Sequence, residues 1–346
     1  DHADTNIHMG EVTNDTYRLD IDPKYFEQTS VIPQPESIYD ERGEVPWKKD
    51  LFGEEATEEQ IVKTQVTSEA DTQALDSKLE QASAQIAALQ KEVEQLKNTR
   101  NTVSKEIGKM KKAGEIVALT HELMKNNICD GVTTKELDRI AEEFIRSKGA
   151  IPSFKNYNGY PASICASVND VVIHGIPDNT RLKNGDIIGI DIGAYIDGYH
   201  GDSANTYGVG EISKKAADLI DAAKRGFEEG IKMAVAGNRV GDISSAIQQY
   251  VEGRGYSIVR EFVGHGVGAQ MHEEPEVPNY GVAGRGPRLC NGMTLAVEPM
   301  INAGKRNVLM LDDEWTIVTE DGSLSAHYEH SIAITKEEPI LLTVCR

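Results

Sequence analysis

The sequence predicts an α+β fold for residues 113–346, preceded by a long helix over 75–112 and an acidic, irregular segment over 1–74. After residue 113, helical and strand-like patterns interleave without repeated strand–helix–strand units, which is typical of antiparallel sheets in α+β proteins. Residues 75–112 place apolar side chains at heptad spacing. The net charge of −20 divides into −12, +3 and −11 over these three segments in chain order.

Charge and composition exclude several classes of function. A net charge of −20 with a pI of about 4.9 argues against nucleic acid or an anionic membrane as the main partner. No apolar run approaches the roughly 18–20 residues of a membrane span, and no signal segment opens the chain. The four cysteines are scattered, without a CxxC pair. We therefore expect a protein of the reducing cytoplasm.

Residues 1–74 lack sustained periodicity. Prolines interrupt the segment and acidic side chains fill the gaps. Low hydrophobicity with high net charge favours disorder or loose docking over an independent small fold.

The helix expected over 75–112 has two core positions per heptad. The first holds Leu79, Ile86, Val93, Arg100 and Ile107, and the second holds Leu75, Ala82, Leu89, Leu96, Val103 and Met110. β-Branched residues at the first position with leucine at the second favour a two-stranded coiled coil, and hence self-association. A long amphipathic helix packed on its own chain is the alternative. Arg100 interrupts the seam in either case.

The remaining chain divides into helices and strands. We expect helices over 113–127, 133–148, 213–236 and 242–254, and strands over 163–173, 187–196, 199–207, 294–301, 313–318 and 326–334. Thr133 and Glu136 fit a capping box, and Gly149 fits a helix stop. Asp197 and Gly198 fit a two-residue hairpin turn.

This hairpin brings two carboxylates together. With a two-residue turn at Asp197, Asp191 faces Ala204 and Asp202 faces Gly193. Asp191 and Asp202 are then diagonal neighbours on one face, roughly 7–8 Å apart. Two converging carboxylates repel unless a cation or a shared proton lies between them. A divalent metal is one interpretation, and two solvated aspartates are the other.

Three further polar residues lie in sequence surroundings that an ordinary structural role does not explain when the three are taken together. His265 lies between glycines in GHGVG, and Glu298 lies in the apolar run LAVEPMI. Glu329 lies in the strand-like run AHYEHSIAIT. A bare carboxylate destabilises such runs unless it has a partner. Four carboxylates with one histidine suit two adjacent divalent ions.

The ordered set Asp191, Asp202, His265, Glu298 and Glu329, with its GHGVG, EPM and YEH motifs, resembles that of methionine aminopeptidases over residues 113–343. The resemblance implies a pita-bread α+β fold with two pseudosymmetric halves. It implies that these five residues bind two divalent ions (Co, Mn, Fe or Zn), with Asp202 and Glu329 bridging them. The short spacing between His265 and Glu298 resembles the type I branch, which lacks a helical insertion there.

The same resemblance assigns accessory residues. His174 and His272 match the histidines near the scissile amide and the tetrahedral intermediate, and Glu298 is also the proton acceptor. Tyr157, Tyr160, Cys165 and Trp315 match the pocket for the methionine side chain, and we expect Phe154 and Met271 to line it as well. Asn169, Val171 and Ser325 match a monovalent-cation site that some members have.

The implied activity is removal of the N-terminal methionine from nascent polypeptides with a small second residue, which could take place at the ribosome. An Xaa-Pro aminopeptidase or prolidase is the main alternative, since those enzymes use the same ligand pattern. A metal-free pita-bread binding protein is another. Residues 1–112 would be an interaction or fusion module in any of these. Residues 96–115 also resemble the tRNA-gripping arm of seryl-tRNA synthetases, but a helix of net charge +3 is a poor basis for nucleic-acid binding.

Overall fold

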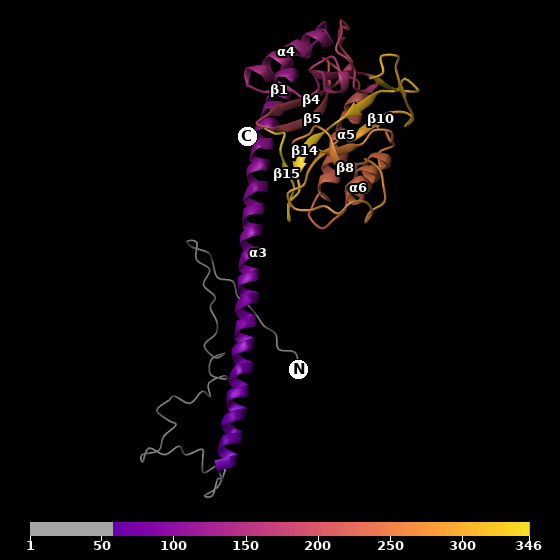
Figure 1. Ribbon diagram of the computed structural model, residues 1–346. Coiled ribbons are helices and arrows are strands. Elements are labelled where there is room, and N and C mark those ends of the chain that lie inside the picture. Colours follow the sequence, from indigo (N-terminus) through magenta and orange to yellow (C-terminus); the bar gives the residue numbers. More distant parts are fainter. Residues whose placement is uncertain (1–57, 346) are drawn as a thin grey trace. The chain divides into compact units, whose positions relative to one another are not determined.

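The structure is a computed structural model that describes residues 58–345, and for residues 58–69 and 71 the backbone alone (Figure 1). The irregular structure expected for residues 1–57 lies outside this part. In the part described, no helix has the length and apolarity that a membrane crossing requires. The chain divides into two compact units, residues 1–92 and 93–346.

The first helix starts earlier than expected. The helices are α3 (Glu58–Asn127), α4 (Thr134–Ser147), the 3₁₀ turn η2 (Tyr157–Gly159), α5 (Lys214–Ile231) and α6 (Val240–Gly253). The expectation of irregular structure was wrong for residues 58–74, because that stretch contains neither proline nor glycine and is rich in good helix formers.

Along α3 the heptad positions differ in their exposure. Leu79, Ile86 and Leu89 are 56–67% exposed. Met110 is buried beside Val267. The last heptads thus pack against residues of their own compact unit. Whether the earlier heptads form a coiled coil stays a prediction.

The helix ends follow local signals with one exception. The Thr133 hydroxyl accepts the Glu136 N–H at 3.1 Å, which confirms the cap, while the Glu136 side chain pairs with Arg139 instead of closing the box. Gly149 has a φ of 75° and ends α4 as expected. Helix α5 ends at Ile231 rather than at residue 236, because Ala236 donates its N–H to the Thr335 carbonyl and so pairs outside the helix.

The strands form four sheets whose ladders are all antiparallel in the described part. The first sheet has the order β1 (Ile151–Pro152), β4 (Ile187–Ile196), β2 (Ile164–Val168), with β5 (Tyr199–Gly208) also paired to β4. The second is β13 (Ser325–His327), β10 (Met300–Asn302), β6 (Ser257–Ile258). The third is β11 (Val308–Met310), β12 (Ile317–Thr319), β3 (Val171–Ile173). The fourth is β15 (Ile340–Leu341), β14 (His330–Ala333), β9 (Thr294–Val297), β7 (Gly264–Gly266), β8 (Glu273–Val277).

The β4–β5 hairpin has the predicted register. Asp191 is opposite Ala204, and Asp202 is opposite Gly193. Asp197 and Gly198 have φ values of 53° and 89°, as a type I′ turn requires at both of its central positions.

Two expected strands are interrupted at a glutamate. The run 294–301 divides into β9 and β10 around Glu298, because Pro299 has no N–H for a ladder. The run 326–334 divides into β13 and β14 around Glu329, whose N–H goes to the Ala204 carbonyl on β5 instead. The expectation of two continuous strands was therefore wrong.

Two other strands are shorter than expected. The run 163–173 divides into β2 and β3 at Asn169, which has a φ of 57°. The run 313–318 contributes only the start of β12, because Asp313 caps a tight turn by accepting the N–H groups of Trp315 and Thr316.

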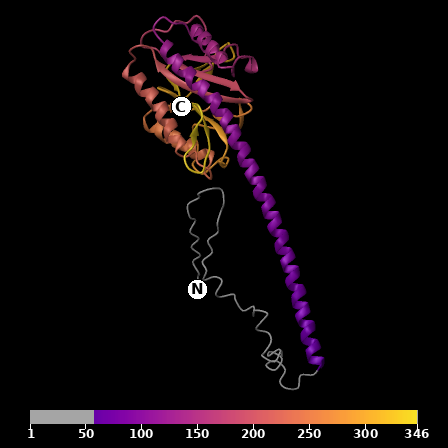
Figure 2. The ribbon, with the colours of Figure 1, turned by 90° about the vertical axis from the view of Figure 1, so that its left-hand side faces the viewer.

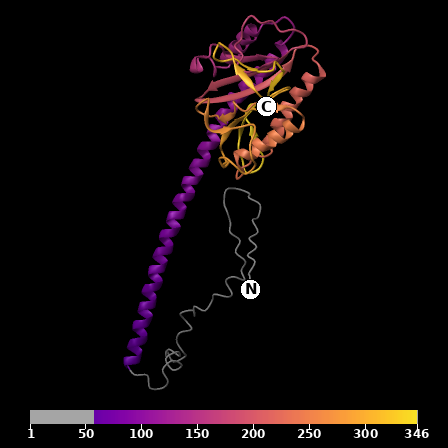
Figure 3. The ribbon, with the colours of Figure 1, turned by 90° about the vertical axis from the view of Figure 1, so that its right-hand side faces the viewer.

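Within residues 93–345, helices cover sheets in two layers. The C-terminal part of α3 and the helix α4 pack on β2 and β4 around buried Ile164 and Ile190 (Figure 2). Helices α5 and α6 lie side by side over the β13–β10–β6 sheet and part of the five-stranded sheet, around buried Phe227 and Ile247 (Figure 3). Two helix-covered halves with their sheets facing each other are the pita-bread architecture that the resemblance implies.

Candidate active site

The residues predicted to bind the divalent ions, to act on the substrate and to form the methionine pocket line one cavity of about 460 Å³. Its walls include Asp191, Asp202, His265, Glu298, Glu329, His174, His272, Phe154, Tyr157, Tyr160, Cys165, Met271 and Trp315. A larger depression of about 560 Å³ lies beside α6 and β8, and it contains none of the predicted ligands. The cavity that matters chemically is therefore the smaller one.

Each predicted ligand comes from a different segment. Asp191 and Asp202 lie on β4 and β5, and His265 lies on β7. Glu298 and Glu329 lie in the two strand interruptions, at the junction of separate sheets. Within a strand, side chains alternate between the two faces of the sheet, which would fix the direction of each glutamate. Because both glutamates lie between strands, this alternation does not apply to them.

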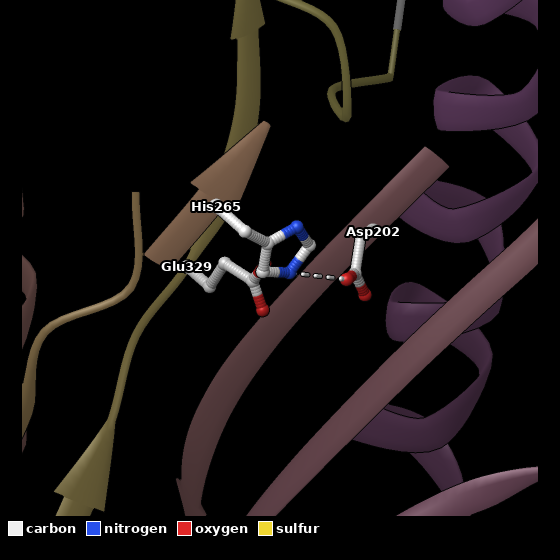
Figure 4. Close-up of side chains that lie close together, drawn as sticks. All are labelled: Asp202, His265 and Glu329. Atoms are coloured by element: carbon white, nitrogen blue, oxygen red, sulfur yellow. Dashed lines mark ion pairs between the residues drawn. The ribbon is translucent and has the colours of Figure 1, made fainter. Parts of the chain in front are cut away.

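Asp202, His265 and Glu329 converge closely (Figure 4). One ligand atom from each of the three lies within 4.8 Å of the others. His265 Nε2 is 3.7 Å from Asp202 Oδ2 and 3.5 Å from Glu298 Oε1. His265 Nδ1 is 2.8 Å from the Gly266 carbonyl, which can only accept a hydrogen bond. Nδ1 therefore carries the proton, and the lone pair of Nε2 faces the carboxylates.

Several carboxylate oxygens of this cluster have no hydrogen-bond partner in the described part of the protein. Burial raises the pKa of Asp191 to about 7. Burial first, and then the neighbouring carboxylates, raise the pKa values of Asp202, Glu298 and Glu329 well above their usual range. Among the described residues, Asp191 Oδ1, Asp202 Oδ1 and Glu329 Oε1 are buried with no hydrogen-bond partner. Unpaired buried oxygens beside an imidazole nitrogen fit divalent cations.

An apolar pocket adjoins the carboxylates. Phe154, Tyr160, Cys165 and Met271 are buried together, with Tyr157 and Trp315 packed against them. Tyr160 meets Trp315 edge-on, with ring centroids 5.1 Å apart. The Tyr160 hydroxyl lies within hydrogen-bond distance of two backbone carbonyls, so it presents an apolar ring to the cavity. The structure thus brings together the six side chains predicted to form the pocket.

Two further histidines flank the cluster. The His272 ring lies 4.2 Å from that of His265, and its Nδ1 is 2.7 Å from the Tyr157 hydroxyl. His174 has a φ of 58° and meets Phe262 edge-on. Burial lowers the pKa of His174 to about 4 and also lowers the pKa of His272. Both imidazoles are therefore neutral at pH 7.

The residues predicted to bind a monovalent cation lie near one another, away from this cavity. The Asn169 carbonyl accepts the Ser325 N–H at 2.9 Å, and Val171 begins β3 two residues later. The Asn169 side chain is engaged by Asp186 and Ile187. Cation binding at these residues stays a prediction.

Some cavity residues were not predicted. Phe262, Val263, Ile173 and Asn158 line the cavity, and nothing in their local sequence distinguishes them from core or turn residues. His327 is buried with Nε2 3.7 Å from Glu298 Oε2. Its position two residues before Glu329 was the available signal, since alternate strand residues share a face.

Comparisons with known proteins agree with this geometry. The model of metallopeptidase family M24 matches residues 108–336. Methionine aminopeptidase 1 of Bacillus subtilis is 55% identical over 239 residues, which are 69% of this chain and 96% of that protein. The methionine aminopeptidase of Clostridium acetobutylicum is 54% identical over 241 residues, with 69% and 96% covered.

Solved structures separate the branches of this fold. The methionine aminopeptidase of Rickettsia prowazekii has a TM-score of 0.69 at 42% identity, covering 70% of this chain and 98% of its own. The X-Pro aminopeptidase of Thermotoga maritima has a TM-score of 0.57 at 21% identity, covering 70% and 62%, which shows the shared fold alone.

The local structure agrees with the branch expected. Between β7 and β9, the described chain has the strand β8 and no helix, as the short spacing predicted. The resemblance of residues 96–115 to a seryl-tRNA synthetase arm receives no support from these comparisons. The chain belongs to metallopeptidase family M24, among its methionine aminopeptidases.

Proposed function

We propose that this chain hydrolyses the first peptide bond of polypeptides that begin with methionine and have a small second residue. The observation that carries the proposal is the convergence of four carboxylates, two of them buried, and His265 beside an apolar pocket. A free N-terminal methionine offers an amine for the charged side and a thioether for the apolar side. Its relatives of 54–55% identity bear the same activity in their names.

Two divalent ions fit the predicted ligands. Asp191, Asp202, His265, Glu298 and Glu329 would hold them, and the resemblance implies that Asp202 and Glu329 would serve both ions. When bound, the ions neutralise the carboxylates, polarise the scissile carbonyl and acidify a water molecule. We propose Co, Mn, Fe or Zn as candidates, because a mixed carboxylate and imidazole donor set accepts any of them.

The protein's own groups then move protons and orient the substrate. Glu298 lies at the edge of the cluster and would accept the proton of the attacking water. His272 lines the cavity, and burial lowers its pKa, so its neutral imidazole can donate to the developing oxyanion. His174, whose ring centroid is 6.4 Å from that of Trp315, would orient the amide nitrogen of the leaving peptide.

The pocket explains selection of methionine. An unbranched thioether can enter a narrow space between aromatic rings and makes favourable sulfur–aromatic contacts. Tyr160 and Trp315 meet edge-on and contribute aromatic wall to this space, and Cys165 and Met271 are buried at its wall. A β-branched first residue would meet the rings.

We further propose the setting in which this activity operates. Nascent polypeptides in the cytoplasm present the free N-terminal methionine that the site requires, and the ribosome is where these ends first emerge. The apolar heptad positions that are exposed on α3, from Leu75 to Leu96, support the self-association expected of residues 75–112.

Release of free methionine from Met-Gly-Met-Met and Met-Leu-Met-Met tests the proposal. We expect cleavage of the glycine peptide alone, in Mn²⁺ or Co²⁺, and its loss after chelation. Asp202→Asn should abolish both turnover and two-metal stoichiometry. Cleavage of an Xaa-Pro peptide instead, or turnover that persists after complete metal removal, would contradict the proposal.

A further inference from the structure

The two bridging carboxylates of the proposed site belong to strands that share no ladder. Asp202 lies on β5, whose one edge pairs with β4. The other edge faces residues 327–331, which pass from the three-stranded sheet to the five-stranded sheet. One direct backbone hydrogen bond crosses this gap, from the Glu329 N–H to the Ala204 carbonyl at 2.8 Å. Ladder geometry therefore does not set the separation of Asp202 and Glu329.

Two serine hydroxyls connect the backbones instead. Ser331 Oγ accepts the Asp202 N–H at 3.1 Å and donates to the Asp202 carbonyl at 2.8 Å. Ser203 Oγ donates to the Glu329 carbonyl at 2.6 Å. All four residues are 3% exposed or less. We call Ser203 and Ser331 the serine clamp.

The clamp is reciprocal. Ser203 follows one bridging residue and holds the backbone of the other, while Ser331 comes two residues after Glu329 and holds Asp202. Buried backbone groups require partners, so loss of either hydroxyl leaves a polar group that must move to find one. Such a movement would change the distance between the two carboxylates directly.

We propose that Ser203 and Ser331 are positioning residues that set the separation of the Asp202 and Glu329 carboxylates and thereby the affinity for divalent ions. The proposal rests on the two-metal function above and adds a determinant outside the ligand set. Outer residues that orient metal ligands commonly contribute about 10- to 100-fold to metal affinity.

The same strand offers a matched control. Thr206 Oγ1 accepts the His327 N–H and donates to the His327 carbonyl, both at 2.9 Å. Thr206 is 4% exposed, and its bonding repeats that of Ser331. Its partner, however, is not a predicted metal ligand. Thr206→Val therefore removes an equivalent buried hydroxyl across the same gap without releasing a bridging residue.

The experiment is a calorimetric titration with Mn²⁺ of the full chain, from which bound metal has first been removed with a chelator. Ser331→Ala and Ser203→Ala should each weaken Mn²⁺ binding by about 10- to 100-fold, as loss of an outer ligand partner does. Thr206→Val should weaken Mn²⁺ binding less than either serine variant does, because it releases His327, which lies 3.7 Å from Glu298 and 3.9 Å from Glu329 but is not a predicted ligand. Ser331→Thr, which keeps the hydroxyl, should bind Mn²⁺ more tightly than Ser331→Ala. Thermal unfolding of the chelated proteins gives the purely structural cost of each change.

The outcomes separate the possible failures. Equal losses of Mn²⁺ affinity in Thr206→Val and the serine variants would overturn the clamp, since general loosening between the sheets would explain them. Wild-type affinity in both Ser331→Ala and Ser203→Ala would also overturn it while leaving the proposed function intact. If the wild type binds none of Mn²⁺, Co²⁺, Fe²⁺ and Zn²⁺ in the same titration, the proposed function and the clamp fail together. Should Ser331→Ala not fold, Ser203→Ala decides.

Discussion

Tyr157 connects the apolar pocket to the histidine proposed to stabilise the oxyanion. Its hydroxyl lies 2.7 Å from His272 Nδ1, and the two rings are stacked 5.2 Å apart. This hydrogen bond fixes the orientation of His272 and leaves Nε2 for the substrate. We expect Tyr157→Phe to lower kcat by about 10-fold or more, part of what a positioned acid or base contributes, with little change in KM.

Steady-state kinetics with Met-Gly-Met-Met checks this expectation. Tyr280→Phe is the matched control. Tyr280 lines the separate depression beside α6 and β8, and its ring lies beneath the Arg260 guanidinium. A Tyr157→Phe enzyme that raised KM at constant kcat would assign the tyrosine to pocket packing alone.

His121 is a second residue whose environment predicts a measurable effect. It is bonded to the Tyr207 hydroxyl and the Ser203 carbonyl, and burial lowers its pKa to about 4. Between pH 6.5 and 4 the unfolded chain binds the proton that the folded chain excludes. His121 therefore lowers the folded stability as pH falls through this range, by roughly 1 kcal/mol at pH 5.5.

Urea unfolding at pH 7.5 and pH 5.5 tests the effect of His121. The chelated His121→Gln variant should lose less stability between the two pH values than the chelated wild type does. Identical losses would show that His121 becomes protonated in the folded state without cost.

Individual ligands could be predicted where a local rule fixed their geometry. The two-residue turn at Asp197 determined the register of the hairpin, and therefore the shared face of Asp191 and Asp202. No local rule places Phe262 against His174, because that contact joins loops from different halves of the molecule. The pocket wall depends on such contacts between distant segments, so local sequence patterns alone did not predict it.

At the scale of elements, periodicity predicted helices better than strands. Runs of alternating apolar residues around Glu298 and Glu329 looked like single strands, but each divides between two sheets. Pro299 was a readable sign of the first interruption. The second arises because Glu329 bonds to β5, a partner more than a hundred residues away in sequence. Tertiary pairing of this kind overrides a local pattern.

Helix α3 carries the prediction that belongs to this scale. Leu89 occupies a heptad core position and is 60% exposed. If residues 75–96 form a coiled coil with a second copy, a charge at the seam should abolish association. Leu89→Asp should be monomeric by analytical ultracentrifugation where the wild type is dimeric, with unchanged turnover.

Ala88 provides the control for this change. It lies next to Leu89 on the helix but outside the heptad seam, so Ala88→Asp adds the same charge and should remain dimeric. A wild type that is monomeric at high concentration, or equal dissociation of both variants, would contradict a coiled coil with this seam.

For the whole molecule, the carboxylate cluster lies where the two halves meet. Asp191 and Asp202 come from the sheet under α4, and Glu298 and Glu329 come from segments between the sheets under α5 and α6. Like charges from both halves are thus held together by folding, and their raised pKa values record the cost. Bound cations would neutralise these carboxylates, and because both halves would bind the same cations, the contact between the halves would be stabilised.

Metal removal should therefore destabilise the whole molecule cooperatively. A ligand at about 100 times its Kd stabilises a protein by about 2.7 kcal/mol, which corresponds to roughly 5–10 °C in Tm for a domain of this size. We expect differential scanning calorimetry to show a Tm lower by this amount after chelation. Asp202→Asn should respond in the opposite sense. It removes a charge from the cluster, so the Tm of the metal-free variant should lie above that of the metal-free wild type. Added Mn²⁺ should raise the Tm of this variant only slightly. A chelated Asp202→Asn protein that unfolds well below the chelated wild type would mean that Asp202 stabilises the fold itself rather than a metal-dependent junction between its halves.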